Sequence, residues 1–191
     1  MQNENRLVKN AWFWIFIFIV LGCVYAVSNH VYQTKLAANS IATEHASEVR
    51  NDYNKIKMHD EKSTIITLFR HPDKTSEKDI HGLQGEKLTW KFKDGKLTVT
   101  FHNGKVVGKS LTKNVNSDTK LVNQTNIDNI NNDSSYQNVV NKLGNPAFES
   151  TKLVDKQSYQ TIKYPTDHNG NGTLFTFFND HLSSKTETTL N

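Results

Sequence analysis

Apolar and polar residues alternate along several short segments in the C-terminal two thirds of the chain. Such alternation is typical of strands that bury one face of a sheet. Asp94-Gly95 and Asn103-Gly104 separate three of these segments, and both dipeptides favour the positive φ values of tight hairpin turns. The pattern therefore predicts an antiparallel meander, with a second group of strands further along the chain. The clearer predicted strands are 88–93, 96–102, 105–111, 160–164, 173–178 and 181–188, and a more ragged strand precedes each group of three.

Two short helical segments precede each group of strands, at 53–57 and from about Ser63, then at 127–131 and from Ser134 or Ser135. Serines at these positions can cap a helix, and Pro72 and Pro146 stop the second helix of each pair. The two groups align at a shift of 74 residues, as Pro72 with Pro146, and of 76 beyond the turn. We therefore predict an α+β fold with two tandem helix-helix-four-strand antiparallel repeats.

An uninterrupted apolar segment, residues 11–27, lies close to the N-terminus. As a helix it would be about 25 Å long, at the short end of what crosses a bilayer. Trp12, Trp14 and Tyr25 are placed to lie at the membrane interfaces, and the preceding basic residues favour a cytoplasmic N-terminus. The segment predicts a single-pass signal anchor with the repeats outside. Two alternatives remain, a lipoprotein modified at Cys23 and a secreted form cleaved near Ala26.

These elements divide the chain into regions of different character. Residues 28–52 contain no Gly or Pro and have loosely helical apolar spacing, which predicts a stalk helix. Residues 113–126 are polar and rich in Asn, which is typical of a linker. The predicted regions are a cytoplasmic tail (1–10), a transmembrane anchor (11–27), a stalk helix (28–52), a first α+β repeat (53–112), a linker (113–126) and a second α+β repeat (127–191).

Composition limits the chemistry of the portion outside the predicted anchor. The net charge of +4 is spread along the chain rather than gathered in a nucleic-acid-binding stripe. The single cysteine lies in the apolar segment, so the repeats have no disulfide, which is typical of a bacterial envelope protein. The histidines are scattered, and no nucleophile, paired-acid or phosphate-binding motif is present. We expect no catalysis, cofactor, metal, nucleic acid or small-molecule substrate.

Two segments of the second repeat carry a family resemblance. YQNVVNKLGNPAFE (136–149) ends a helix in leucine-glycine-x-proline, and TLFTFFNDHLSSK (173–185) forms a phenylalanine-rich strand pair around a turn. With the repeated layout, they resemble the beta-lactamase inhibitor protein and the small envelope lipoproteins of the SmpA/OmlA type. The first repeat has Arg70 and His71 where this pattern has glycine. The resemblance implies the same fold and a membrane-tethered, protein-binding habit outside the cell, with a partner that need not be a lactamase.

The alternation assigns residues to the two faces of the sheet. Leu88, Trp90, Leu97 and Val99 should pack on the helices. Leu174 and Phe178 point to the nominally wet face, where they indicate either contact with the other repeat or a partner site. We predict a membrane-anchored binding module that contacts another protein through its sheet faces. The candidate contacts are Lys91, Thr98, Thr100, His102, Lys163, Leu174, Thr176 and Phe178.

Two other functions remain open on the sequence alone. The chain could be a structural component of an envelope complex that acts through its anchor and stalk. It could instead bind an anionic wall polymer, an alternative that rests on the net charge of +4. Binding to such a polymer would weaken steeply as salt is added.

Overall fold

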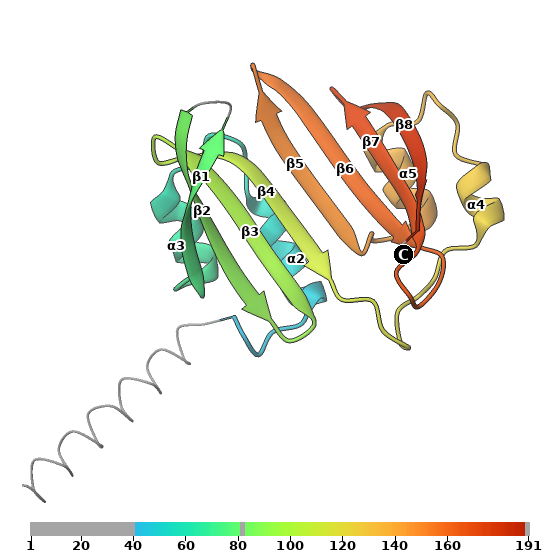
Figure 1. Ribbon diagram of the computed structural model, residues 1–191, viewed down its shortest axis with the longest axis horizontal. Coiled ribbons are helices and arrows are strands. Elements are labelled where there is room, and N and C mark those ends of the chain that lie inside the picture. The colour runs from blue at the N-terminus through green and yellow to red at the C-terminus, as the bar shows by residue number, and fades with distance from the viewer. Residues whose placement is uncertain (1–40, 81–82, 190–191) are drawn as a thin grey trace, which may run out of the picture. The chain divides into compact units, whose positions relative to one another are not determined.

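The computed structural model describes residues 41–80 and 83–189, and these residues belong to one compact unit. Its strands form one antiparallel eight-stranded sheet in the order β1 to β8 (Figure 1). The helices are α2 (Ala46–Lys55), α3 (Lys62–Phe69), α4 (Gln124–Asp128) and α5 (Tyr136–Leu143). The strands are β1 (Lys74–Ile80), β2 (Leu83–Phe92), β3 (Gly95–His102), β4 (Lys105–Lys113), β5 (Phe148–Val154), β6 (Gln157–Pro165), β7 (Gly172–Phe178) and β8 (His181–Thr188).

The single sheet corrects the predicted fold class. We predicted a transmembrane helix, a stalk helix and two tandem helix-helix-four-strand repeats, and this description was wrong. β4 pairs with β5 along its length, from Gly108 opposite Lys152 to Thr112 opposite Phe148. That pairing satisfies the backbone groups that separate four-stranded sheets would each leave exposed on one edge. The described chain is therefore mostly one continuous sheet with short helices.

The membrane prediction is corrected as well. No helix in the described ranges 41–80 and 83–189 is long and apolar enough to cross a bilayer. The predicted anchor, residues 11–27 with Trp12, Trp14 and Tyr25, lies outside those ranges, as do Cys23 and Ala26. On this finding the single-pass localisation was wrong.

Part of the predicted stalk belongs to the folded unit. Helix α2 begins at Ala46, and its residues Ala46, Val49 and Tyr53 are buried at helical spacing against the sheet. Ile41, just before the helix, is buried in the same cluster. The prediction of a solvated stalk was wrong from residue 46 onward because this apolar stripe, although loose in sequence, meets strand β4. Residues 28–40 lie outside the described ranges.

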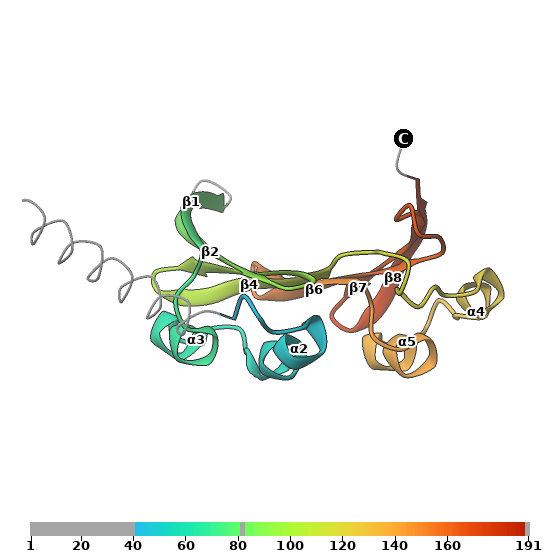
Figure 2. The ribbon, with the colours of Figure 1, turned by 90° about the horizontal axis from the view of Figure 1, so that it is seen from below.

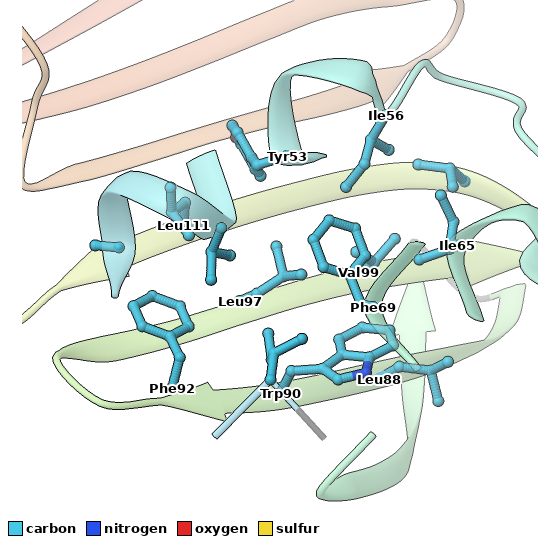
Figure 3. Packing of buried hydrophobic residues seen from close by; sticks show 14 of the residues in the cluster. Tyr53, Ile56, Ile65, Phe69, Leu88, Trp90, Phe92, Leu97, Val99 and Leu111 are labelled. Carbon is cyan, nitrogen blue, oxygen red and sulfur yellow. The ribbon is translucent and has the colours of Figure 1, made fainter. Parts of the chain in front are cut away.

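The described helices all lie against one face of the sheet, as Figure 2 shows. Under α2 and α3, the strands β2 to β4 place Trp90, Leu97 and Leu111 in the first core cluster, much of which is seen in Figure 3. Under α4 and α5, β6 and β7 place Ile162 and Phe175 in the second. The sheet is therefore covered by helices on one side, and strands β2 to β7 bury side chains there.

Local signals in the sequence set the ends of several elements. Ser135 caps α5 by accepting a hydrogen bond from the N–H of Asn138 at 3.2 Å, as the sequence predicts. Gly144 ends the same helix with φ of 83°, a conformation that glycine adopts without strain. The β3–β4 turn has positive φ at Asn103 and Gly104, and the β7–β8 turn has it at Asn179-Asp180.

Candidate interaction surface

The face of the sheet opposite the described helices presents three transverse rows of side chains. Residues directly opposite in antiparallel strands share a face, so the pairing register gives each row. The first row is Lys91, Lys96, Thr112, Phe148, Lys163, Leu174 and Thr186. The second is Lys74, Thr89, Thr98, Ser110, Ser150, Thr161, Thr176 and Ser184. The third is Ser76, Lys87, Thr100, Gly108, Lys152, Tyr159, Phe178 and His181. We call this surface the open face.

The structure places every predicted contact residue on the open face. Seven of the eight candidates lie in the three rows: Lys91, Lys163 and Leu174 in the first, Thr98 and Thr176 in the second, and Thr100 and Phe178 in the third. His102 lies at the end of β3, two residues beyond Thr100 on the same side, where its Nδ1 is 3.1 Å from the Gln84 carbonyl oxygen. Their role in binding stays a prediction.

Neither Leu174 nor Phe178 belongs to a hydrophobic core cluster. Both are half-buried and point away from the described helices, because their neighbours Phe175 and Phe177 fill the core. The two halves of the sheet join edge to edge, so neither residue is covered by the other half. The ring of Phe178 instead contacts Tyr159, with 5.1 Å between ring centroids. Tyr159 is 38% exposed, the large apolar side chain that is most open in the described chain.

The open face has two shallow hollows, and Tyr159 lines one of them. One has a volume of about 280 Å³ and is lined by Ser150, Lys152, Val154, Tyr159, Thr161 and Thr176. The other, about 410 Å³, lies across the β4–β5 boundary and shares Lys152 and Val154 with the first. Sequence reasoning missed Tyr159, Phe148 and Lys152 because β5 has no clear alternation and the predicted strand 160–164 begins one residue after Tyr159. The surface therefore has relief as well as a chemical pattern.

A buried ion pair on the helix side holds the two halves of the sheet together. Arg50 of α2 donates to Glu149 of β5 through Nη1, and through Nη2 to the carbonyl oxygen of Pro146 at 2.9 Å. The second oxygen of Glu149 accepts the hydroxyl of Tyr136, from α5, at 2.8 Å. Glu149 is only 3% exposed, so its charge depends on these partners. The network links α2, which packs on the first half of the sheet, to β5 and α5 in the second half. It thereby fixes the position of the two halves of the open face relative to each other.

Lys109 extends this polar centre toward the first half of the sheet. Its ammonium lies 4.4 Å from the ring centroid of Tyr53. It also donates to the carbonyl oxygens of Tyr53 and Ile56, at 3.0 and 2.8 Å. These two carbonyls close the C-terminal end of α2, where a cation complements the helix dipole. Strand β4 is thereby tied to the helix that also carries Arg50.

Burial and the Glu149 charge shift the ionisation of the surrounding groups. Burial raises the pKa of Tyr136 above its ordinary value of 10.0, and the neighbouring Glu149 carboxylate raises it further. The pKa values of Tyr53 and Tyr164 are raised for the same two reasons, burial first. Burial lowers the pKa of Lys109 from 10.5, against the attraction of Glu149 and Asp60. The tyrosines thus stay neutral beside the carboxylate at neutral pH.

This arrangement predicts a loss of stability in alkali. Because the folded-state pKa of Tyr136 is raised, its contribution is fully present below the unfolded-state pKa near 10.0 and is lost as the pH rises above it. The lowered pKa of Lys109 acts in the opposite sense, and only up to its unfolded-state pKa of 10.5. We expect the free energy of unfolding to fall steadily between about pH 10.5 and 12 in urea titrations. Tyr136→Phe should fall less steeply, and an equal slope in both proteins would contradict the assignment.

The described residues offer little for metal chemistry. Among residues 41–80 and 83–189, no group of three or more His, Cys, Asp or Glu side chains could hold a metal ion. In the loop before β7, Asp167 accepts hydrogen bonds from the backbone N–H groups of Asn169 and Asn171, at 2.9 and 3.0 Å. Its carboxylate is thus engaged in closing a turn. The arrangement is suited to recognition by surface contact.

Comparison with known proteins identifies the fold. The model of one protein family, described as Domain of Unknown Function with solved-structure structure (DUF3862), matches residues 45–190. The crystal structure of a proposed beta-lactamase inhibitor protein from Streptococcus mutans is similar, with a TM-score of 0.61 and 19% identity. The match covers 78% of this chain and 99% of that one. No curated protein matches the sequence. The predicted resemblance to the beta-lactamase inhibitor fold is thereby confirmed.

Proposed function

Because this chain belongs to the DUF3862 family, whose description assigns no function, we propose its role from its own surface: it binds another protein through the open face, without catalysis. The observation that carries this proposal is a broad sheet face that no described helix covers and that presents the Tyr159–Phe178 pair. Antiparallel sheets commonly have one solvated face, but that face is usually polar throughout. Aromatic anchors surrounded by polar side chains are instead typical of binding hot spots.

The shape of the sheet supports the same function. In Figure 2, strand β1 and the end of β8 both bend toward the open face, so its two sides flank the centre. The protein from Streptococcus mutans that shares the fold is described as a proposed beta-lactamase inhibitor, and an inhibitor of an enzyme acts by binding a protein. An identity of 19% is evidence for a shared fold only, so the comparison does not identify the protein that this chain binds.

A site-specific cross-link tests this function. Full-length protein carrying a photoreactive phenylalanine analogue in place of Tyr159 is exposed to an extract of its native cells. We expect a discrete cross-linked protein, because Tyr159 is exposed at the centre of the proposed contact. The matched control carries the same analogue in place of Thr64, an exposed residue of α3 on the opposite side of the sheet.

A second substitution shows whether the cross-link reports a specific contact. Phe178→Asp places a charge beside Tyr159 and should reduce the yield of that product about tenfold, as loss of a hot-spot side chain does. Circular dichroism should show an unchanged fold. The proposed function fails if the Thr64 position gives the same product, or if Phe178→Asp leaves the yield unchanged in a folded protein.

A further inference from the structure

All of the strand carboxylates and most of the strand lysines lie on opposite faces of the sheet. In register, the lysines at open-face positions are Lys74, Lys78, Lys87, Lys91, Lys96, Lys105, Lys152 and Lys163, whereas Lys109, Lys113 and Lys185 fall on the helix side. The strand carboxylates are Glu77, Asp79, Glu86, Glu149 and Glu187, and in register all of them fall on the helix side. Glu86, for example, lies opposite the buried Phe101 and pairs with Lys62 of α3 at 2.7 Å. A chain whose net charge is only +4 thus carries a strongly cationic surface.

Hydroxyl groups complete the pattern between these lysines. In the second row, one Ser or Thr stands on each strand from β2 to β8: Thr89, Thr98, Ser110, Ser150, Thr161, Thr176 and Ser184. Strands lie about 4.8 Å apart, so the row is about 29 Å long. Hydroxyl and ammonium groups both donate hydrogen bonds, whereas ionised carboxylates only accept them. The open-face positions of the strands therefore present many donors. The one strand carboxylate among the residues that line the two described hollows is Asp79, near the end of β1.

We infer that the open face binds an acidic protein surface, one rich in exposed Asp and Glu that lies across the strands. This inference rests on the proposed function and adds the chemistry of the partner. The lysines supply complementary charge, and the hydroxyl row supplies donors to carboxylate oxygens. A length of about 29 Å suits the footprint of a folded protein better than that of a small ligand.

The aromatic pair favours a protein over an anionic polymer as the occupant. Tyr159, which contacts Phe178, lines a hollow together with Lys152 and Thr161, and an apolar side chain of a partner could occupy that hollow. A sugar-phosphate or polyphosphate chain offers repeated charge but no apolar side chain for such a place. Lys152 links both features, since it stands opposite Tyr159 and lines both hollows. Apolar contact at the centre with charge around it is the usual anatomy of a protein interface.

A charge-reversal pair tests the inference. The double variant Lys152→Glu with Lys163→Glu changes the open face, and Lys57→Glu with Lys142→Glu changes the net charge equally in the helix layer. The probes are poly-L-glutamate and inorganic polyphosphate, added to the isotope-labelled full chain at low salt. We expect poly-L-glutamate to shift the backbone amide signals of open-face residues. Its affinity should fall about tenfold in the open-face variant and less than twofold in the helix-layer variant.

Three outcomes would overturn the inference. Poly-L-glutamate could fail to bind, both variants could lose affinity equally, or polyphosphate could bind the open face where poly-L-glutamate does not. Gln substitutions at Lys152 and Lys163 repeat the test should the Glu variant not fold. The protein that cross-links to the analogue at position 159 is then used to distinguish the two proposals. If it is captured equally by the open-face variant, binding through this face stands and the acidic partner is refuted.

Discussion

Replacing Glu149 by Ala is expected to lower the free energy of unfolding by about 3–5 kcal/mol. The substitution leaves the Arg50 guanidinium in a buried site with only the Pro146 carbonyl as partner. It also removes the carboxylate that accepts the hydrogen bond of the Tyr136 hydroxyl. Removing one member of a buried ion pair costs more than the pair itself contributes, because the remaining charge stays desolvated. Urea unfolding of the full chain, followed by circular dichroism, measures the loss.

Two further variants show whether the loss comes from the buried charge. Glu187→Ala removes an exposed carboxylate from β8 and should change the same free energy by less than about 0.5 kcal/mol. Arg50→Met combined with Glu149→Leu replaces the pair by apolar groups and should recover most of the lost stability. A loss below about 1 kcal/mol for Glu149→Ala would show that water reaches the ion pair and that the pair does not hold the two halves of the sheet together.

Replacing Trp90 by Ala is expected to cost about 3–5 kcal/mol, a loss of similar size from a different cause. Trp90 is 0% exposed, and its ring packs at a tilt on Phe69 with 5.8 Å between centroids. Its indole N–H donates to the Arg70 carbonyl oxygen at 3.2 Å. The substitution leaves a cavity between β2 and α3 and removes the donor for that carbonyl. Urea unfolding again gives the change.

Removing an aromatic ring should cost much less stability on the open face than in the core. Tyr159→Ala removes a ring of comparable size from the open face and should cost less than about 1 kcal/mol, because that ring is already partly in water. Should Trp90→Ala fail to fold, Trp90→Phe keeps a ring in place and should cost about 1–2 kcal/mol. Equal losses for Trp90→Phe and Tyr159→Ala would contradict the assignment of core and open faces.

Six of the eight strands of the described chain, all except β1 and β5, could be located from alternation, because most of these six bury one of their faces. β8 occupies 181–188 as predicted, and β3 differs from its predicted range only by Gly95. The residues assigned to the core face, Trp90 and Phe175 among them, are buried for the same reason. The alternation is a local property of the strand, so it needs no knowledge of the partner strand.

The arrangement of the strands could not be predicted in the same way. β4 and β5 pair across a polar stretch that reads as a linker, and either strand would also fit as a sheet edge. The Arg50–Glu149 contact joins residues 99 positions apart, one from a predicted stalk and one from a strand without clear alternation. The sequence around Arg50 does not indicate that it pairs with Glu149, and the sequence around Glu149 does not indicate Arg50. Long-range pairing of this kind is what separates one sheet from two.

The candidate surface was partly predictable for the same physical reason. Leu174 and Phe178 stand out in sequence because they break the alternation of β7 by placing large apolar groups on its wet face. The separation of the strand carboxylates from most of the strand lysines could not be seen, because it emerges only when eight strands are set in register. The hydroxyl row is hidden likewise, since Ser and Thr are common in strands and loops alike.

The β4–β5 pairing also determines which backbone groups can join other chains. It leaves β1 and β8 as the sheet edges in the described part of the chain. Exposed Lys74, Glu77 and Lys78 line β1, and exposed Lys185 and Glu187 line β8. Charged side chains on edge strands oppose the strand-to-strand stacking that leads to aggregation and fibres. Because β4 and β5 are paired at its centre, the sheet can expose a wide face to partners while resisting self-association along its charged outer edges.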